Sequence, residues 1–242
     1  MTDVLLVRGW WPALLAVLLL GGDAATQVQP DQVAALKQSL QQGLAQARRY
    51  EWIETTVISL KGEEKGRTQK RCYYGADGKV EKVPLDQPAQ PSAPPSGGRR
   101  GRSGRLKQQI VDKKKDEMKD YMERAAALIH KYVPPAAAQI QAAKDAGHVT
   151  VTPQPDGAVR LLISQYLQPG DSMAIDLNRA ANTLNGLTVN TWLDKPEETV
   201  ALAVRMATLP DGALYAAETT LDAKAKHITV VIQNSGHRKV TP

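Results

Sequence analysis

From His148 to the end, the sequence alternates short apolar–polar segments with turn signals, and this pattern constrains the fold more than any other feature. Successive turns lie about 10–16 residues apart, which is typical of an antiparallel meander. Six or seven strands are therefore predicted in this half. The turns fall at Pro155-Asp156-Gly157, Pro169-Gly170-Asp171, Arg179–Asn182, Asp194–Glu197, Pro210-Asp211-Gly212 and Asp222–Lys226.

Each of these predicted strands is apolar on one side and mostly polar on the other. An antiparallel sheet with this alternation keeps one face in water and has the other covered. The residues predicted to share the covered face are Val159, Leu161 and Ile163; Met173, Ile175 and Leu177; Leu187, Val189, Thr191 and Leu193; Val200, Leu202, Val204 and Met206; and Ile228, Val230 and Ile232.

The N-terminal half supplies the elements that can cover this face. Apolar residues recur at helical spacing in 31–49 and 106–132, and an Ala-rich helix is expected at 135–146. Lys114 and Glu117 interrupt the apolar stripe of the long helix, so its first half is expected to project into solvent while Met118–Tyr132 packs. Three β-rich segments are predicted near 52–58, 68–74 and 79–83.

These elements predict an α+β fold with a wide, curled antiparallel sheet of nine or ten strands, resembling half of a barrel, whose concave face is covered by helices. The chain contains no Phe, so the core must use Val, Leu, Ile, Ala and Met. Two outcomes follow from the pattern: the helices seal a dry core, or they form a lid over an apolar cavity.

Residues 1–25 are predicted to be a secretory signal peptide. Arg8 precedes an apolar run from Trp10 to Leu20, and small residues follow it up to Ala25. The run is shorter than the roughly 20 residues of a membrane span. A periplasmic or secreted protein, soluble after cleavage, is therefore expected. Residues 26–242 would form one α+β domain with a disordered insertion at 84–104, which holds five prolines and four glycines.

The net positive charge is concentrated in residues 97–119, which hold nine Lys or Arg and three Asp or Glu. An anionic membrane surface is one expected partner, and a solvated loop without a partner is the alternative. Nucleic acid ranks below both, because no stacking aromatic is interleaved with the arginines. The candidate headgroup contacts are Arg99, Arg100, Arg102, Arg105, Lys113, Lys114 and Lys115.

The sequence lacks the motifs of an enzyme or a metal site. The single cysteine, Cys72, excludes an intramolecular disulfide and a Cys-rich zinc site, and it is expected to be a buried apolar residue. No G-x-S-x-G, H-E-x-x-H or phosphate loop is present. The aspartates at the predicted turns are expected to hydrogen-bond to the backbone rather than to act in catalysis. The histidines at strand edges are expected to be exposed or hydrogen-bonded. Glu51 and Glu54 are assigned to the polar face of a strand, and Trp52 and Trp192 to packing. No catalytic residue, metal or cofactor is therefore expected.

The order of elements, a helix, three strands, helices and a long meander behind a signal peptide, resembles the lipoprotein-carrier (LolA/LolB-like) architecture. The C-terminal segments 176–178, 185–187, 192–196, 208–212 and 234–236 resemble a group of exported bacterial proteins without an assigned function. The resemblance implies a curled sheet with a helical lid that binds an acyl chain or another apolar ligand non-covalently. The resemblance does not identify any individual functional residue of this chain.

The expected function is therefore that of an exported, non-enzymatic binding or carrier protein for a lipid or an acylated protein. The alternative is a cell-envelope structural or interaction module with a sealed core and no ligand. The sequence does not determine the oligomeric state. The candidate ligand face is Val159, Leu161, Ile163, Met173, Ile175, Leu177, Val189, Leu202, Val204, Met206, Ile228 and Val230.

Overall fold

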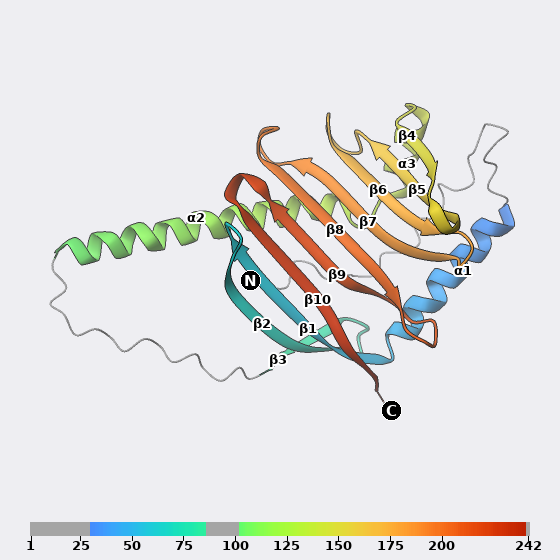
Figure 1. Ribbon diagram of the computed structural model, residues 1–242, viewed down its shortest axis with the longest axis horizontal. Coiled ribbons are helices and arrows are strands. Elements are labelled where there is room, and N and C mark those ends of the chain that lie inside the picture. The colour runs from blue at the N-terminus through green and yellow to red at the C-terminus, as the bar shows by residue number, and fades with distance from the viewer. Residues whose placement is uncertain (1–29, 86–101, 241–242) are drawn as a thin grey trace.

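The computed structural model describes residues 30–85 and 102–240 of the 242-residue chain. Three helices and ten strands follow one another in the order that the sequence predicts (Figure 1). They are α1 (Pro30–Ala47), β1 (Tyr50–Leu60), β2 (Glu63–Tyr74), β3 (Val80–Pro84), α2 (Arg102–Tyr132), α3 (Ala137–Asp145), β4 (Val149–Pro153), β5 (Ala158–Ser164), β6 (Ser172–Asn178), β7 (Thr183–Trp192), β8 (Thr199–Thr208), β9 (Leu214–Ala223) and β10 (Ile228–Lys239).

All ten strands belong to one open antiparallel sheet in the order β3-β2-β1-β10-β9-β8-β7-β6-β5-β4. The meander β4–β10 runs without a crossover, and the N-terminal strands join it through pairing of β1 with β10. The predicted fold class, a wide curled antiparallel sheet with helices, is confirmed. A sheet of this width twists and curls, and the curvature is visible in Figure 1.

The helices pack on the face of the sheet that we call the covered face. Leu40 of α1, Ile129 and Tyr132 of α2, and Ile140 of α3 are buried in one apolar cluster with side chains of β5–β9. A second small cluster joins Tyr121 of α2 to Ala223 and Ile228, where β9 ends and β10 begins. The N-terminal half of α2 extends beyond the sheet (Figure 1), and residues 113–117 are exposed, as the interrupted stripe predicts.

A buried polar network ties the C-terminal end of α2 to the sheet. Asp171, in the turn between β5 and β6, accepts hydrogen bonds from the Tyr132 hydroxyl and from the backbone N–H groups of residues 166, 167 and 168. The Tyr132 and Thr191 hydroxyl oxygens are 2.7 Å apart. Burial and the neighbouring carboxylate raise the pKa of Tyr132. Because the buried carboxylate has four donors, this part of the interior is satisfied without a ligand.

The expected insertion at 84–104 lies mainly outside the described residues. At its edges, Pro84 is the last residue of β3 rather than part of the linker, and α2 begins at Arg102 rather than Leu106. A proline is tolerated in β3 because this is an edge strand, where a missing N–H breaks no ladder bond on the open side. The predicted signal peptide, residues 1–25, also lies outside the described part of the chain.

Candidate ligand-binding site

An apolar pocket of about 150 Å³ lies between the covered face and the helices, toward the β1–β3 end of the sheet. Its sheet side is formed by strands β1–β3 and β7–β10, and its helix side by the last turns of α1 and α2. Most of the lining is aliphatic or aromatic. The lining residues include Leu44, Ala47, Tyr50, Trp52, Glu54, Tyr74, Val80, Lys82, Ile129, His130, Val133, Leu184, Leu187, Leu202, Val204, Met206, Leu214, Tyr215, Ala216, Ile232, Asn234 and His237.

Gly43 allows α1 to approach the sheet closely enough to form one wall. A Cβ at this position would lie 3.0 Å from both the Gly212 carbonyl oxygen and the Leu214 Cβ, closer than ordinary van der Waals contact. The next helical residues that face the sheet, Leu44 and Ala47, line the pocket. The close approach therefore brings the Leu44 and Ala47 side chains to one wall of the pocket.

Five aromatic rings gather at the β1–β10 end of the pocket. The His237 ring stacks on Trp52, with centroids 6.2 Å apart and planes at 15°, and it lies 4.0 Å from the Tyr215 ring. Tyr74 and Tyr50 contact Trp52 and His237 respectively, at 5.7 and 6.4 Å. Burial lowers the pKa of His237, which favours the neutral imidazole at neutral pH. The rings form an apolar surface with a few polar edges.

A β-bulge in β10 turns His237 toward the pocket. Glu51 pairs with Arg238 and Ile53 with Ser235, so β10 carries one extra residue between these pairs. Gly236 in the bulge has φ +63°, a left-handed conformation that favours glycine. Without the extra residue, strict alternation from Asn234 would point His237 to the other face. The bulge therefore brings Asn234 and His237 into the same pocket.

A buried ion pair joins Glu54 of β1 to Lys82 of β3 across the intervening strand. The Lys82 ammonium nitrogen lies 2.7 and 2.6 Å from the two carboxylate oxygens, and the two side chains are 9% and 8% exposed. The expectation that Glu54 lies on the polar face with Glu51 was wrong. The two residues are three apart, so a regular strand points them to opposite faces; Glu51 contacts Arg71 and Arg238 outside, whereas Glu54 points inward.

Two polar atoms of side chains that line the pocket have no hydrogen-bond partner among the described residues. They are the Trp52 indole Nε1 and the Asn234 Oδ1, both buried. Asn234 lies opposite Glu54 in the β1–β10 pairing, and its amide nitrogen donates to the Ala216 carbonyl at 2.8 Å. An unpaired buried polar atom costs about 1–3 kcal/mol. One donor and one acceptor on side chains that line the pocket are thus buried without a partner.

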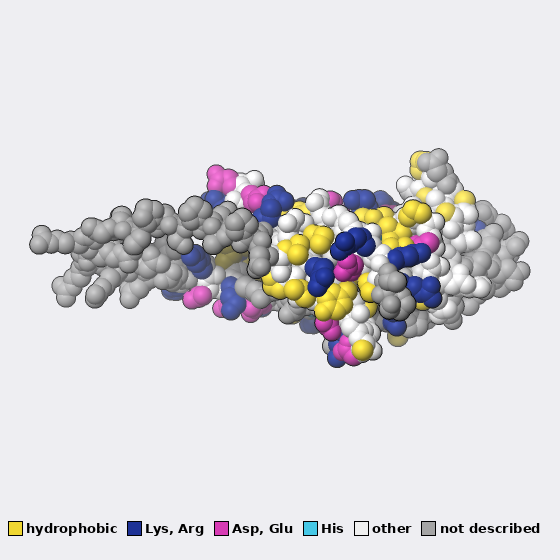
Figure 2. All heavy atoms as spheres, turned by 90° about the horizontal axis from the view of Figure 1, so that it is seen from below, with side chains coloured by type: hydrophobic (Ala, Val, Ile, Leu, Met, Phe, Trp, Pro, Cys, Tyr) yellow, Lys and Arg dark blue, Asp and Glu magenta, His cyan; other side chains and the backbone are white. Residues whose placement is uncertain are grey.

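Charged side chains surround the outer end of the pocket. Asp211 accepts a hydrogen bond from the Tyr50 hydroxyl at 2.8 Å and lies 2.9 Å from the Lys239 ammonium. Hydrogen bonds from Lys239 and Tyr50 lower the pKa of Asp211 to about 2. Figure 2 views this end of the molecule and shows hydrophobic side chains between Lys, Arg, Asp and Glu side chains.

The structure divides the twelve residues predicted as the ligand face into two groups. Leu202, Val204 and Met206 of β8 line the pocket. The others lie on the same face, in or beside the apolar core beneath the helices, and do not line the pocket: Val159, Leu161, Ile163, Met173, Ile175, Leu177, Val189, Ile228 and Val230.

Sequence reasoning missed the polar and aromatic side of the pocket. Trp52 was assigned to packing, but it lines the pocket. The signal that could have found it is the alternation Trp52, Glu54, Thr56, which places these three side chains on one strand face. No local signal identifies Lys82, Asn234 or His237.

The predicted basic contacts are only partly described. Arg99 and Arg100 lie outside the described residues, and Arg102 and Arg105 are in the first turns of α2. The ammonium of Lys113 lies 3.9 Å from Glu117, and Lys114 and Lys115 are exposed. A membrane contact for this segment stays a prediction.

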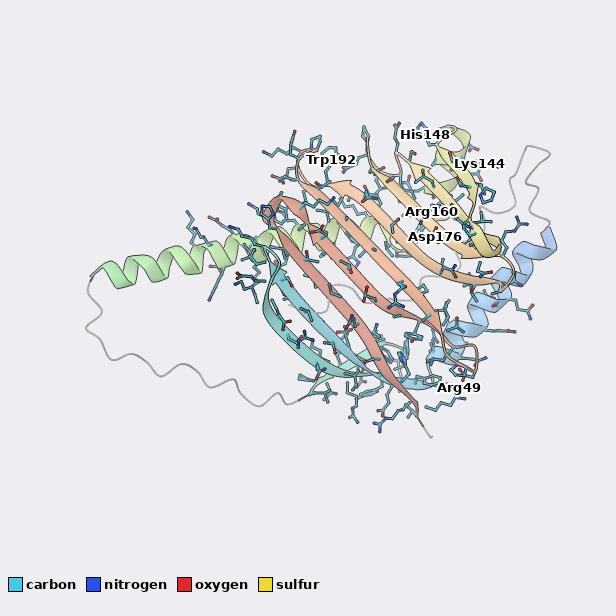
Figure 3. The ribbon with its side chains drawn as sticks, viewed as in Figure 1. Arg49, Lys144, His148, Arg160, Asp176 and Trp192 are labelled. Atoms are coloured by element: carbon cyan, nitrogen blue, oxygen red, sulfur yellow. The ribbon has the colours of Figure 1, made fainter. Side chains whose placement is uncertain are left out.

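The opposite face of the sheet is polar and solvent-exposed. Arg160 of β5 and Asp176 of β6 lie side by side there (Figure 3), with two parallel hydrogen bonds of 2.7 and 2.8 Å. Within residues 30–85 and 102–240, no three His, Cys, Asp or Glu side chains gather in a way that could hold a metal ion. Among the helices described, none is long and apolar enough to cross a membrane.

No protein-family model and no curated protein sequence matches the chain. Among solved structures, the chain is similar to the crystal structure of a DUF1329 family protein from Desulfovibrio piger ATCC 29098, with 8% sequence identity. The similarity covers 85% of this chain and 92% of that chain, with a TM-score of 0.33. This degree of similarity does not assign a function.

Proposed function

We propose that this protein is an exported, non-enzymatic binding or carrier protein that shelters the apolar part of a lipid or lipidated ligand. The observation that carries the proposal is the apolar pocket between the covered face and helices α1 and α2. Its lining is mainly aliphatic and aromatic, with a few polar groups at one end, which is the usual composition of a small-molecule site.

The size of the pocket favours a ligand that is only partly enclosed. A closed apolar cavity of about this volume binds benzene, so about 150 Å³ accommodates a short alkyl segment or one ring. A longer acyl chain would need additional space outside the pocket. The rest of the ligand would extend past the outer end, where Tyr50, Asp211 and Lys239 lie.

The element order supports the same proposal through its resemblance to lipoprotein carriers, in which a curled sheet and a helical lid hold acyl chains. Export follows from the predicted signal peptide. The sealed-core module is the rival, because most of the covered face is filled by its own helices.

Native mass spectrometry of the exported protein, purified without detergent, tests the proposal. A co-purifying mass of lipid size that organic extraction releases would support it. A mass that stays free of ligand after incubation with phospholipid and acylated peptide would favour the rival.

A matched pair of variants locates the binding. Val204→Trp fills the pocket from β8, whereas Ala203→Trp places the same side chain on the exposed face of the same strand. Ligand content should fall in the first variant and persist in the second. Equal retention in both variants would place any bound lipid elsewhere.

A further inference from the structure

The polar end of the pocket contains one ion pair, which has no net charge. Glu54 and Lys82 neutralise each other through contacts to both carboxylate oxygens. They are the only Asp, Glu, Lys or Arg among the described residues that line the pocket, and burial favours the neutral form of His237 there. An ionised ligand carboxylate would have to share Lys82 with Glu54 or stay unpaired, which is costly in a buried site.

Two buried side-chain atoms at this end, one donor and one acceptor, have no hydrogen-bond partner among the described residues. The Asn234 amide nitrogen is bonded to the Ala216 carbonyl, so its oxygen is the free atom, and the Trp52 indole N–H is free as well. A ligand that satisfies both atoms carries an acceptor and a donor. Hydrogen bonding to these two atoms would remove the cost of leaving them buried and unpaired.

The two atoms lie on neighbouring strands at the aromatic end of the pocket. Trp52 precedes Glu54 by two residues on β1, and Asn234 is opposite Glu54 on β10, so all three side chains share the covered face. The Trp52 indole is held by ring contacts with Tyr74 and His237. Bulky side chains therefore fix the donor before a ligand arrives.

Resting on the proposed function, we infer that the pocket selects ligands whose apolar chain ends in a neutral group with both a donor and an acceptor, of which a carboxamide is the simplest. Its carbonyl accepts from Trp52 Nε1, and its N–H donates to Asn234 Oδ1. The alkyl chain lies against the aliphatic side of the pocket, along Leu187, Leu202 and Val204. The free carboxylate of a fatty acid is the disfavoured form.

Titration of octanamide and octanoate into ¹⁵N-labelled protein at pH 7 tests this inference by NMR. The two probes share a chain length and differ in the head group. We expect octanamide to bind with a Kd about tenfold lower and to shift the Trp52 indole N–H resonance, assigned through Trp52→Phe. The Trp192 indole, bonded to the Pro169 carbonyl at 3.2 Å, is the internal reference and should not move.

Asn234→Leu should weaken octanamide binding about fivefold while changing octanoate binding by less than about twofold. Asn190→Leu, on the exposed face of β7, is the matched control and should leave both affinities unchanged. The comparison of the two probes on the unmodified protein needs no variant, so it stands even if Asn234→Leu fails to fold.

Equal or tighter binding of octanoate, or an unmoved Trp52 indole signal with bound octanamide, would overturn the inference and leave the proposed function intact. If neither probe binds and native mass spectrometry finds no lipid, the proposed function fails together with the inference.

Discussion

Two valines on one face of β8 separate a dry core from a pocket. Val200 is fully buried in the apolar cluster, whereas Val204, four residues later on the same strand and face, is half-buried and lines the pocket. Replacing each with glutamate applies the same chemical change to the two environments. The difference in unfolding free energy between the two variants therefore reports on the pocket itself.

The expected loss of unfolding free energy in each variant follows from the burial of the valine that is replaced. Val200→Glu loses about 1.5–3 kcal/mol of apolar burial and places an unpaired carboxylate in the core, which costs about 3–5 kcal/mol more. That sum is comparable to the whole stability of a typical domain, about 5–15 kcal/mol. Val204 is only half-buried, so the substitution loses less apolar burial and the carboxylate keeps contact with solvent, and we expect about 1–2 kcal/mol. The predicted difference is therefore about 2.5–7 kcal/mol.

Urea denaturation followed by circular dichroism measures both values. Ala203→Glu, on the exposed face of β8, is the control and should change stability by less than about 0.5 kcal/mol. If Val200→Glu does not fold, Val200→Thr and Val204→Thr provide a milder pair, because a buried hydroxyl without a partner costs about 1–3 kcal/mol.

An equal loss of stability at the two positions would refute the reasoning, because the covered face would then be one continuous dry core. An unchanged melt in Val200→Glu would refute the assignment of the strand face. Val204→Glu should also lose any bound ligand, which native mass spectrometry checks on the same sample.

Three further predictions follow from buried or paired ionisable groups. Glu54→Leu or Lys82→Met alone should destabilise the protein by about 3–5 kcal/mol. The double variant should recover most of that loss, and additive losses in a double-mutant cycle measured by urea denaturation would contradict a coupled pair. The pKa of Asp211, about 2, lies below its ordinary 3.8. Ionised Asp211 therefore stabilises the fold above pH 4, and this contribution is lost as the pH falls from about 4 to about 2. Asp211→Asn should lower the melting temperature at pH 7 and flatten its decline across that range, and an unchanged profile would argue against these contacts. Burial raises the pKa of the fully buried Cys72 to about 11, so at pH 8 a thiol reagent such as DTNB should react only slowly with the native protein and rapidly in guanidinium; rapid native labelling would contradict its burial.

The sequence by itself determined which side chains of the meander face the core. That pattern depends on the two-residue repeat of a strand, which is a local property of the backbone. The apolar alternation of β5–β8 and the turns that separate these strands could therefore be predicted from the sequence. The same local reasoning predicted that the first half of α2 projects beyond the sheet, because charged residues interrupt its stripe.

Only the tertiary structure decided where the pocket lies and which polar groups enter it. Glu54 and Lys82 are 28 residues apart and meet because β1, β2 and β3 are neighbours in the sheet. Asn234 joins them through the pairing of the first and last strands, and His237 through the one-residue bulge at Gly236. Such placements depend on long-range register and on a break in the strand repeat, and neither is encoded in the local periodicity of any single segment.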